Sequence, residues 1–259
     1  MNVNYSELSW PDIKQAVEDD AIVILPTGCI EQHGPHLPLD CDAGSPAAAV
    51  AQVQQQLGVR ALVLPVLPYG PAAEHMSFPG TISLSQETHM RVVREIVESL
   101  LSHGFRRIVI FPGCAGHMGI QAAVYGLWSE ERRKGRDVVI EVAPIFAGMA
   151  AVQAVAQEHF PGIQDIHAGE FETAICLATR PHLVARDRIP DEDCRLPHHG
   201  SWWPRIEEIS ASGATGSPRR ATAEAGRELL EALQSSIADW LAEFDQRTRR
   251  EMTQGEVPE

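Results

Sequence analysis

The sequence predicts an α/β protein with a mostly parallel sheet that helices cover on both faces. Two runs, AIVILP at 21–26 and RIVIFP at 107–112, are continuously apolar and rich in β-branched residues, as strands buried on both faces are. Segments with apolar residues at helical spacing separate these runs. Strands that alternate with helices in this way are typical of parallel sheets.

The predicted elements follow one another along the chain. Pro46 near a first turn and Gly58 at the end bound the first predicted helix. Ser85 is an N-cap candidate and Gly104 a C-terminal stop for the next one. Prolines interrupt the second predicted strand. We expect strands at 21–26, 60–70, 107–112 and 137–145, and helices at 45–58, 85–104, 118–135, 148–158, 169–179 and 221–248.

Length and composition favour one globular domain. The 259 residues show no internal repeat, no low-complexity linker and no domain boundary. With 44% hydrophobic residues the chain can bury a sizeable core. We expect a single domain over 1–250, followed by a polar tail at 251–259.

Charge and cysteine usage exclude several classes of function. The formal net charge of −14 repels phosphate backbones, so no nucleic-acid partner is expected. No apolar stretch is long enough to span a membrane, and the N-terminus does not resemble a signal peptide. The five cysteines are scattered and odd in number, which indicates reduced thiols and a cytoplasmic protein.

The segment PTGCIEQHGPHLPLDCD, at 26–42, follows the first predicted strand and is dense in polar side chains. Within it, Glu31 and His33 point to the same side if the segment is extended, and Asp42 can fold back over them. Functional groups in such sheets collect beyond the carboxyl ends of the strands. His117 follows another predicted strand, and Glu170 begins a later helix. The segment is either part of a metal site or a solvated polar loop.

Three carboxylates and two imidazoles would suit a pair of metal ions. Two divalent ions and a bridging hydroxide would balance the charges of the set formed by Glu31, His33, Asp42, His117 and Glu170. Mixed nitrogen and oxygen ligands suit Zn²⁺, Mn²⁺ or Fe²⁺, which the sequence does not distinguish, and suit Ca²⁺ poorly. Two ions bridged by an aspartate make water nucleophilic near neutral pH.

Five segments in order resemble the creatininase (creatinine amidohydrolase) family: LPTGCIEQHGPHLPLDCD, PYGPAAEHMSFPGTISL, GCAGHMG, HAGEFETA and GATGSPRRATAEAG. The resemblance implies a three-layer α/β/α sandwich and a cytosolic, often hexameric, two-metal hydrolase of non-peptide C–N bonds. It also implies that Glu31 and His117 bind one ion, that His33 and Glu170 bind the other, and that Asp42 bridges them.

The chain departs from the creatinine hydrolases themselves. Their ligand glutamate, two residues after the metal-binding histidine, is Gly119 here, and no tryptophan shortly precedes His167. Met118 and Ile120 make one wall of the pocket more apolar. We therefore expect another branch of the family, one that acts on a small cyclic amide, lactam or formamide.

The remaining roles follow from position. The resemblance suggests that His167 protonates the leaving nitrogen. Cys29, Cys41 and Cys114 are interpreted as ordinary small buried residues. The residues expected to orient ligands or to contact substrate are His36, Glu74, His75, Glu172, Trp202 and Trp203. Two alternatives stay open: a hydrolase that opens a cyclic ketone by C–C cleavage, and a binding protein without activity.

Overall fold

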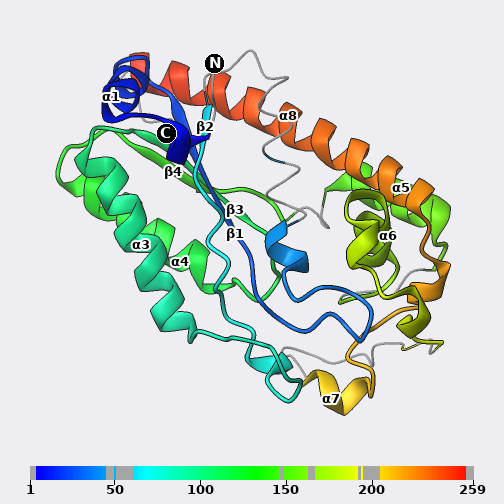
Figure 1. Cartoon of the computed structure of the whole chain (residues 1–259). Coiled ribbons are helices and arrows are strands. Elements are labelled where there is room, and N and C mark those ends of the chain that lie inside the picture. The colour runs from blue at the N-terminus through cyan, green and yellow to red at the C-terminus, as the bar shows by residue number, and fades with distance from the viewer. Residues whose placement is uncertain are drawn as a thin grey trace.

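The computed structural model describes residues 4–44, 50, 61–145, 149–162, 167–191, 194 and 205–254, and centres on a parallel sheet (Figure 1). Within these residues the sheet has four strands in the order β2-β1-β3-β4. Every pairing is parallel, and Val23 of β1 lies opposite Leu62 of β2 and Ile108 of β3. The strands are β1 (Ile22–Thr27), β2 (Ala61–Val63), β3 (Arg107–Pro112) and β4 (Val139–Val142).

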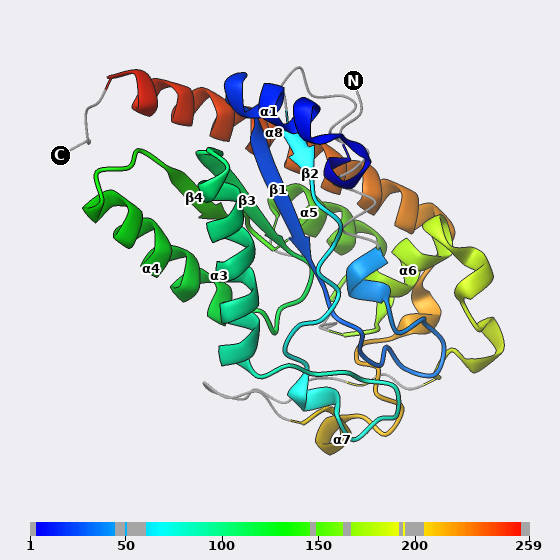
Figure 2. The same cartoon turned by 60° about the vertical axis from the view of Figure 1, so that its left-hand side comes forward.

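Helices lie on both sides of the strands, with α3 and α4 on one side and α5 and α6 on the other (Figure 2). The α-helices of the described chain are α1 (Trp10–Glu18), α3 (Gln86–Ser102), α4 (Gly119–Arg133), α5 (Ala150–His159), α6 (Glu170–Thr179), α7 (Ile206–Ile209) and α8 (Ala223–Gln254). The short 3₁₀ turns are η1 (Tyr5–Glu7), η2 (Ala73–His75), η4 (Pro181–Leu183), η5 (Arg186–Arg188) and η6 (Pro218–Arg220). None of the described helices is long and apolar enough to cross a membrane.

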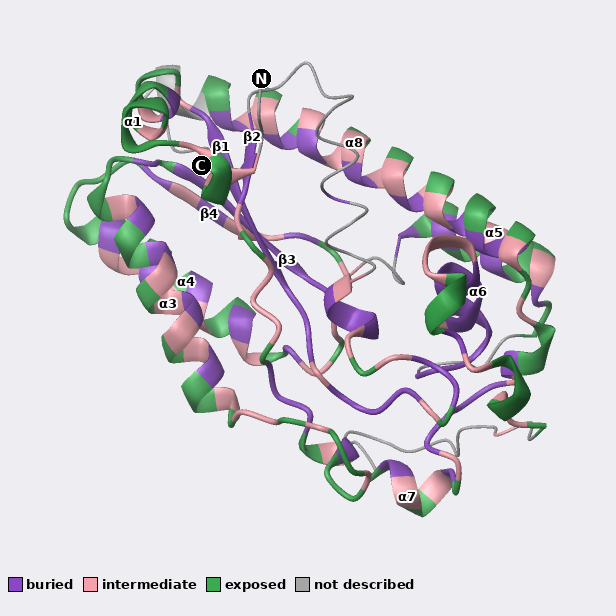
Figure 3. Cartoon of the chain, in the orientation of Figure 1, coloured by how far each residue is buried: buried purple, intermediate pink, exposed green. Residues whose placement is uncertain are grey.

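Alternation along the strands divides the apolar core into two halves. Ile22 and Ile24 of β1 pack with buried residues of α5, α6 and α8. Val23 and Leu25, on the opposite face, pack with α1, α3 and α4. The strands β1, β2 and β3 are buried and β4 is partly buried, while the outer faces of the helices are exposed (Figure 3). The expected α/β/α sandwich is confirmed.

Several elements differ from the prediction. The second strand covers only Ala61–Val63 instead of 60–70, because Pro65 and Pro68 lack the N–H group that a ladder needs. The helix α1 was not predicted, although Ser9 and Asp12 form a capping box at its start. The last helix continues to Gln254, past the expected start of the polar tail. The helix expected at 45–58 lies largely outside the described residues.

The contact between α6 and α8 depends on Gly226. A Cβ atom there would lie 1.9 Å from the carbonyl oxygen of Ala174, so Gly226→Ala forces the two helices apart. We expect a loss of about 1–3 kcal/mol in the free energy of unfolding, measured by urea titration. The matched control is Gly126→Ala in α4, where no atom lies within 4 Å of the added Cβ. There the better helix propensity of alanine should raise stability by about 0.5–1 kcal/mol. Equal effects at both sites would contradict the close packing.

Candidate metal centre

The polar segment after β1 folds back on itself at the carboxyl edge of the sheet. Gly28 permits this return, because a Cβ atom at this position would lie 2.6 Å from the Cα atom of Ala43. The backbone N–H group of Glu31 donates to the carbonyl oxygen of Leu39 at 2.9 Å, which closes the loop. As a result Glu31, His33 and Asp42 are buried side by side.

Asp42 lies at the centre of the cluster. Its Oδ1 atom is 3.2 Å from Nε2 of His33, while its buried Oδ2 atom has no hydrogen-bond partner among the described residues. Nδ1 of His33 lies 3.1 Å from the carbonyl oxygen of Glu31, which suits donation from Nδ1 and turns Nε2 toward the carboxylates. Glu172 extends the cluster, with Oε2 3.6 Å from the same Nε2 atom. An orphaned carboxylate oxygen among such donors fits a bound cation.

Burial and mutual charge perturb these groups. Burial and the neighbouring Asp42 raise the pKa of Glu31 well above its ordinary value. Burial acts to lower the pKa of His33, but Glu172 and Asp42 outweigh it and raise that pKa well above the usual range. The cluster therefore contains acidic groups that repel one another and an imidazole held between carboxylates.

His75 and His167 both lie next to the carboxylate of Glu31. Nε2 of His75 lies 3.5 Å from Oε1 of Glu31, and Nδ1 of His167 lies 3.6 Å from the same oxygen. The two imidazole rings are 4.1 Å apart. Nε2 of His167 is 2.6 Å from the carbonyl oxygen of Gln32, which suits donation from this nitrogen. Burial, with His33 and His75 nearby, holds the pKa of His167 well below its ordinary value.

Two residues expected to bind metal, Glu170 and His117, contact other groups in the structure. The buried carboxylate of Glu170 accepts a hydrogen bond from the backbone N–H group of Ser217 at 2.9 Å and from Arg220 at 3.2 Å. Nδ1 of His117 lies 2.8 Å from Oγ1 of Thr27, and Nε2 lies 3.2 Å from Sγ of Cys29. The structure thus does not bring Glu170 to His33, while ligand atoms of His117, Cys29 and Cys114 lie within 4.8 Å of one another beside the cluster.

Cys114, interpreted from the sequence as an ordinary buried residue, lies beside the carboxylates. Its Sγ atom is 4.0 and 3.9 Å from the two carboxylate oxygens of Glu31. Ligand atoms of Cys29, Glu31, Asp42 and Cys114 all lie within 4.8 Å of one another. A hydrogen bond with Cys29 is the largest cause that raises the pKa of the Cys114 thiol, and burial is the second. The sequence feature that could have pointed to Cys114 is its position two residues after a predicted buried strand.

The other expected residues surround the cluster or lie outside the description. Nε2 of His36 lies 2.8 Å from Oγ1 of Thr173, so His36 ties the loop to α6. Glu74 is half-buried, and burial raises its pKa. Asp40 pairs with Arg180 at 2.7 Å, away from the cluster. Trp202 and Trp203 lie outside the described residues.

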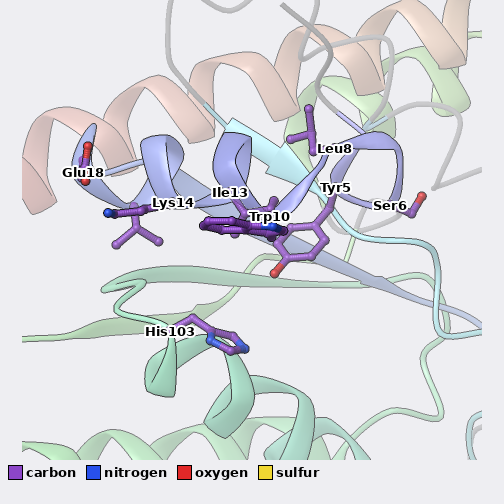
Figure 4. A pocket seen from close by; sticks show the side chains of 9 residues that line it. Tyr5, Ser6, Leu8, Trp10, Ile13, Lys14, Glu18 and His103 are labelled. Atoms are coloured by element: carbon purple, nitrogen blue, oxygen red, sulfur yellow. The ribbon is translucent and has the colours of Figure 1, made fainter.

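A hollow of about 770 Å³ lies at the opposite edge of the sheet (Figure 4). Side chains of η1 and α1, among them Tyr5 and Trp10, line it together with His103 at the end of α3. These elements precede the amino ends of β1 and β3. Functional groups of such sheets gather at the carboxyl edge, so we assign the chemistry to the cluster and not to this hollow.

His89 in α3 is buried next to His117, with ring centroids 4.6 Å apart, and neither ring nitrogen has a hydrogen-bond partner among the described residues. Burial lowers its pKa from 6.5 to about 4. Because folding favours the neutral ring, protonation of this group costs no stability above pH 6.5, and the loss of stability grows as the pH falls toward 4.

We therefore expect His89→Leu to reduce the loss of stability over this pH interval, and to raise stability at neutral pH by about 1–3 kcal/mol. Urea midpoints measured across the interval check both effects. The control is His103→Leu, at an exposed position just after α3. An unchanged pH dependence in His89→Leu would contradict the prediction.

The chain is similar to two groups of known hydrolases. It is 32% identical to creatinine amidohydrolase of Pseudomonas putida, over 93% of this chain and 97% of that protein. It is 30% identical to the mycofactocin precursor peptide peptidase of Mycobacterium ulcerans, over 90% of this chain and 86% of that protein.

Solved creatininase structures share the fold. One described as "Creatininase Mn" and a mutant described as the "Zn-Zn type" each superpose with a TM-score of 0.82 at 31% identity, covering 94% of this chain and 98% of theirs. The fold and the cluster together define the class of protein, that of metal-dependent amidohydrolases. A family model described as "Creatininase: Creatinine amidohydrolase" matches residues 6–241. The chain belongs to the creatininase family.

Proposed function

We propose that the chain uses two divalent metal ions to hydrolyse a non-peptide C–N bond in a small cyclic amide, lactam or formamide. The observation that carries this proposal is the buried carboxylate of Asp42, which lies between Glu31 and His33 with one oxygen unpartnered among the described residues. When bound, the two ions supply the nucleophilic water and the Lewis acid of the reaction. The manganese and zinc-zinc creatininase structures support this chemistry.

We assign the ligands from the geometry of the cluster. Asp42 would contact both ions, Glu31 would hold the first, and His33 and Glu172 would hold the second. Glu172 replaces Glu170 in this assignment because its Oε2 atom, which also accepts from the backbone N–H group of Ala168, lies 3.6 Å from His33. Both carboxylate oxygens of Glu170 are instead bonded to Arg220 and Ser217. The carbonyl oxygen of Glu31 fixes the ring of His33, as partners of a metal-bound histidine commonly do.

His167 is the proposed proton donor to the leaving nitrogen. The carbonyl oxygen of Gln32 holds the proton on Nε2, so Nδ1 is the nitrogen that faces the cluster. Burial keeps this ring neutral in the resting protein, because it lowers the pKa of His167. Nδ1 therefore accepts a proton as water is deprotonated and then delivers it to the nitrogen that leaves.

The proposal extends to the state of the protein in the cell. By family resemblance it is a cytoplasmic homo-oligomer, a hexamer, in which residues 1–250 form one catalytic domain. Light scattering of the purified protein measures the mass of the assembly against the 28.4 kDa of one chain.

The test combines metal analysis with a substrate panel. We expect about two transition-metal ions per chain and turnover of at least one cyclic amide, lactam or formamide, in a panel that also contains a short peptide and a cyclic ketone. Hydrolysis of the peptide alone would favour the activity named for the mycobacterial relatives, and turnover of the ketone alone would favour C–C cleavage. A protein that binds no metal would rule the proposal out.

A matched pair of variants tests the ligand assignment. Glu172→Gln should lose about one metal ion per chain, because it removes an anionic ligand beside His33. Glu170→Gln should retain both ions and lower stability, because it weakens a buried contact with Arg220. Loss of a metal ion in Glu170→Gln and retention of both ions in Glu172→Gln would mean that Glu170, and not Glu172, is the metal ligand.

A further inference from the structure

Cys114 lies next to Glu31, the proposed ligand of the first metal ion. It is the second residue after β3, so its side chain lies at the carboxyl edge of the sheet. Its Sγ atom lies 3.9 and 4.0 Å from the two carboxylate oxygens of Glu31. Neighbouring ligand atoms on a tetrahedral zinc ion are separated by about 3.3–3.8 Å, so small movements would bring sulfur and oxygen onto one ion.

Cys29 and His117 lie next to Cys114, with ligand atoms within 4.8 Å of one another, but the three side chains have different partners. Cys29 is fully buried, and its thiol lies 3.6 Å from the carbonyl oxygen of Pro71 and 3.2 Å from Nε2 of His117. The other ring nitrogen of His117, Nδ1, lies 2.8 Å from Oγ1 of Thr27. Cys114 is only partly buried, and its sulfur accepts a hydrogen bond from the backbone N–H group of Gly116 at 3.4 Å. Such a donor suits a sulfur atom that carries negative charge.

An independent observation points to a ligand between these groups. Asp42 is 4% exposed, and its Oδ2 atom has no hydrogen-bond partner within the described part of the chain. A carboxylate oxygen of Asp42 lies within 4.8 Å of Sγ of Cys114 and of a carboxylate oxygen of Glu31. A buried carboxylate that faces another carboxylate and a thiol fits a shared cation.

We infer that Cys114 binds the first metal ion as a thiolate, together with Glu31 and Asp42. This inference rests on the proposed function and deepens it. Glu31, Asp42, Cys114 and Glu172 then supply four negative charges, which match the four positive charges of two divalent ions. Sulfur is a soft ligand, so the first site prefers Zn²⁺ to Mn²⁺.

X-ray absorption of the zinc-loaded, reduced protein tests this without measuring activity. We expect a sulfur atom at about 2.3 Å from zinc in addition to nitrogen and oxygen at about 2.0–2.1 Å. Cys114→Ser should lose the sulfur contribution and bind its first zinc ion at least about 100-fold more weakly, since partners that only support a ligand already cost 10–100-fold. Co²⁺-substituted protein offers a second readout, the thiolate charge-transfer band in the near ultraviolet.

Two further variants control for general effects of removing a thiol. Cys194→Ser changes a cysteine whose sulfur donates to the carbonyl oxygen of Ile209, outside the cluster, and should leave the sulfur signal intact. Cys29→Ser should also keep the signal. Loss of the signal in Cys29→Ser and not in Cys114→Ser would overturn the inference in favour of Cys29.

The outcomes separate the inference from the proposed function. A wild-type protein with two bound ions, hydrolytic activity and no sulfur around zinc would overturn the role of Cys114 and leave the hydrolase standing. A protein that takes up no metal would remove both. Circular dichroism identifies a Cys114→Ser variant that fails to fold. In that case the X-ray absorption spectrum of the wild-type protein, with or without sulfur around zinc, decides whether a thiolate binds the metal.

Discussion

Replacing Asp42 with alanine is expected to remove both metal ions and to abolish turnover. Asp42 is the carboxylate that lies between Glu31 and His33, so its loss takes a ligand from each proposed ion at once. Without either ion, the reaction loses its activated water and its Lewis acid. We expect kcat/KM to fall by at least about 10⁴-fold, which corresponds to more than about 5 kcal/mol of transition-state stabilisation. Metal content per chain and kcat/KM are the two measurements.

Asp40 provides the matched control, because it is also an aspartate of the same loop. Its carboxylate is 47% exposed and pairs with Arg180. Asp40→Ala should retain both metal ions, with a change in stability of at most about 1 kcal/mol. If Asp42→Ala retained two ions and Asp40→Ala lost them, the cluster around Asp42 could not be the metal centre.

The layered fold could be predicted because its strands carry strong local signals. The runs that became β1 and β3 are apolar at every position, which fits strands buried on both faces. The extent of β2 could not be predicted from its apolar residues, since backbone pairing beyond Val63 is limited by Pro65 and Pro68. The helix α1 is only nine residues long and largely exposed, with Trp10 79% accessible and Ala16 its one buried residue, so it presents a short apolar pattern besides its capping box.

Part of the site was also predictable. Glu31, His33 and Asp42 lie on one short loop, where Gly28 and a proline-rich sequence allow the chain to return. Their proximity depends on local geometry and can be inferred from twelve consecutive residues of the sequence.

The choice between Glu170 and Glu172 depends on tertiary structure. Residues two apart on a helix differ by about 200° around its axis, so only one of them can face the cluster. Which one does so is set by the orientation of α6 against α8, and that orientation depends on contacts such as the one at Gly226. Spacing along the sequence therefore could not decide between them.

The position of Cys114 illustrates a different difficulty. In the sequence the carboxylates and imidazoles already form a complete ligand set, which is why the cysteines were interpreted as ordinary buried residues. The turn between β3 and α4 places His117 against Thr27 and Cys29, and it places the thiol of Cys114 next to Glu31.

Replacing His167 with alanine is expected to leave both metal ions in place and to lower kcat by about 10²–10⁴-fold, the usual contribution of a positioned acid or base. Nδ1 of His167 lies 3.6 Å from Oε1 of Glu31, its ring lies beside that of His33, and the backbone carbonyl oxygen of Gln32 fixes its orientation. Because the side chain is 6% exposed, its removal leaves a space of imidazole size inside the protein. Added imidazole should therefore restore part of kcat, which a purely structural role would not allow.

The control is His159→Ala at the end of α5, where the imidazole pairs with Glu228 on the surface. This variant should keep its activity with or without added imidazole. Metal analysis of His167→Ala separates two roles that the geometry allows, because His167 also lies within 4.8 Å of His33 and Glu172. Retention of two ions with rescue by imidazole means that His167 carries the proton, since the metal centre is then intact. Loss of one ion means that His167 is a ligand, and the proton donor must then be sought at His75, whose ring lies 4.1 Å away.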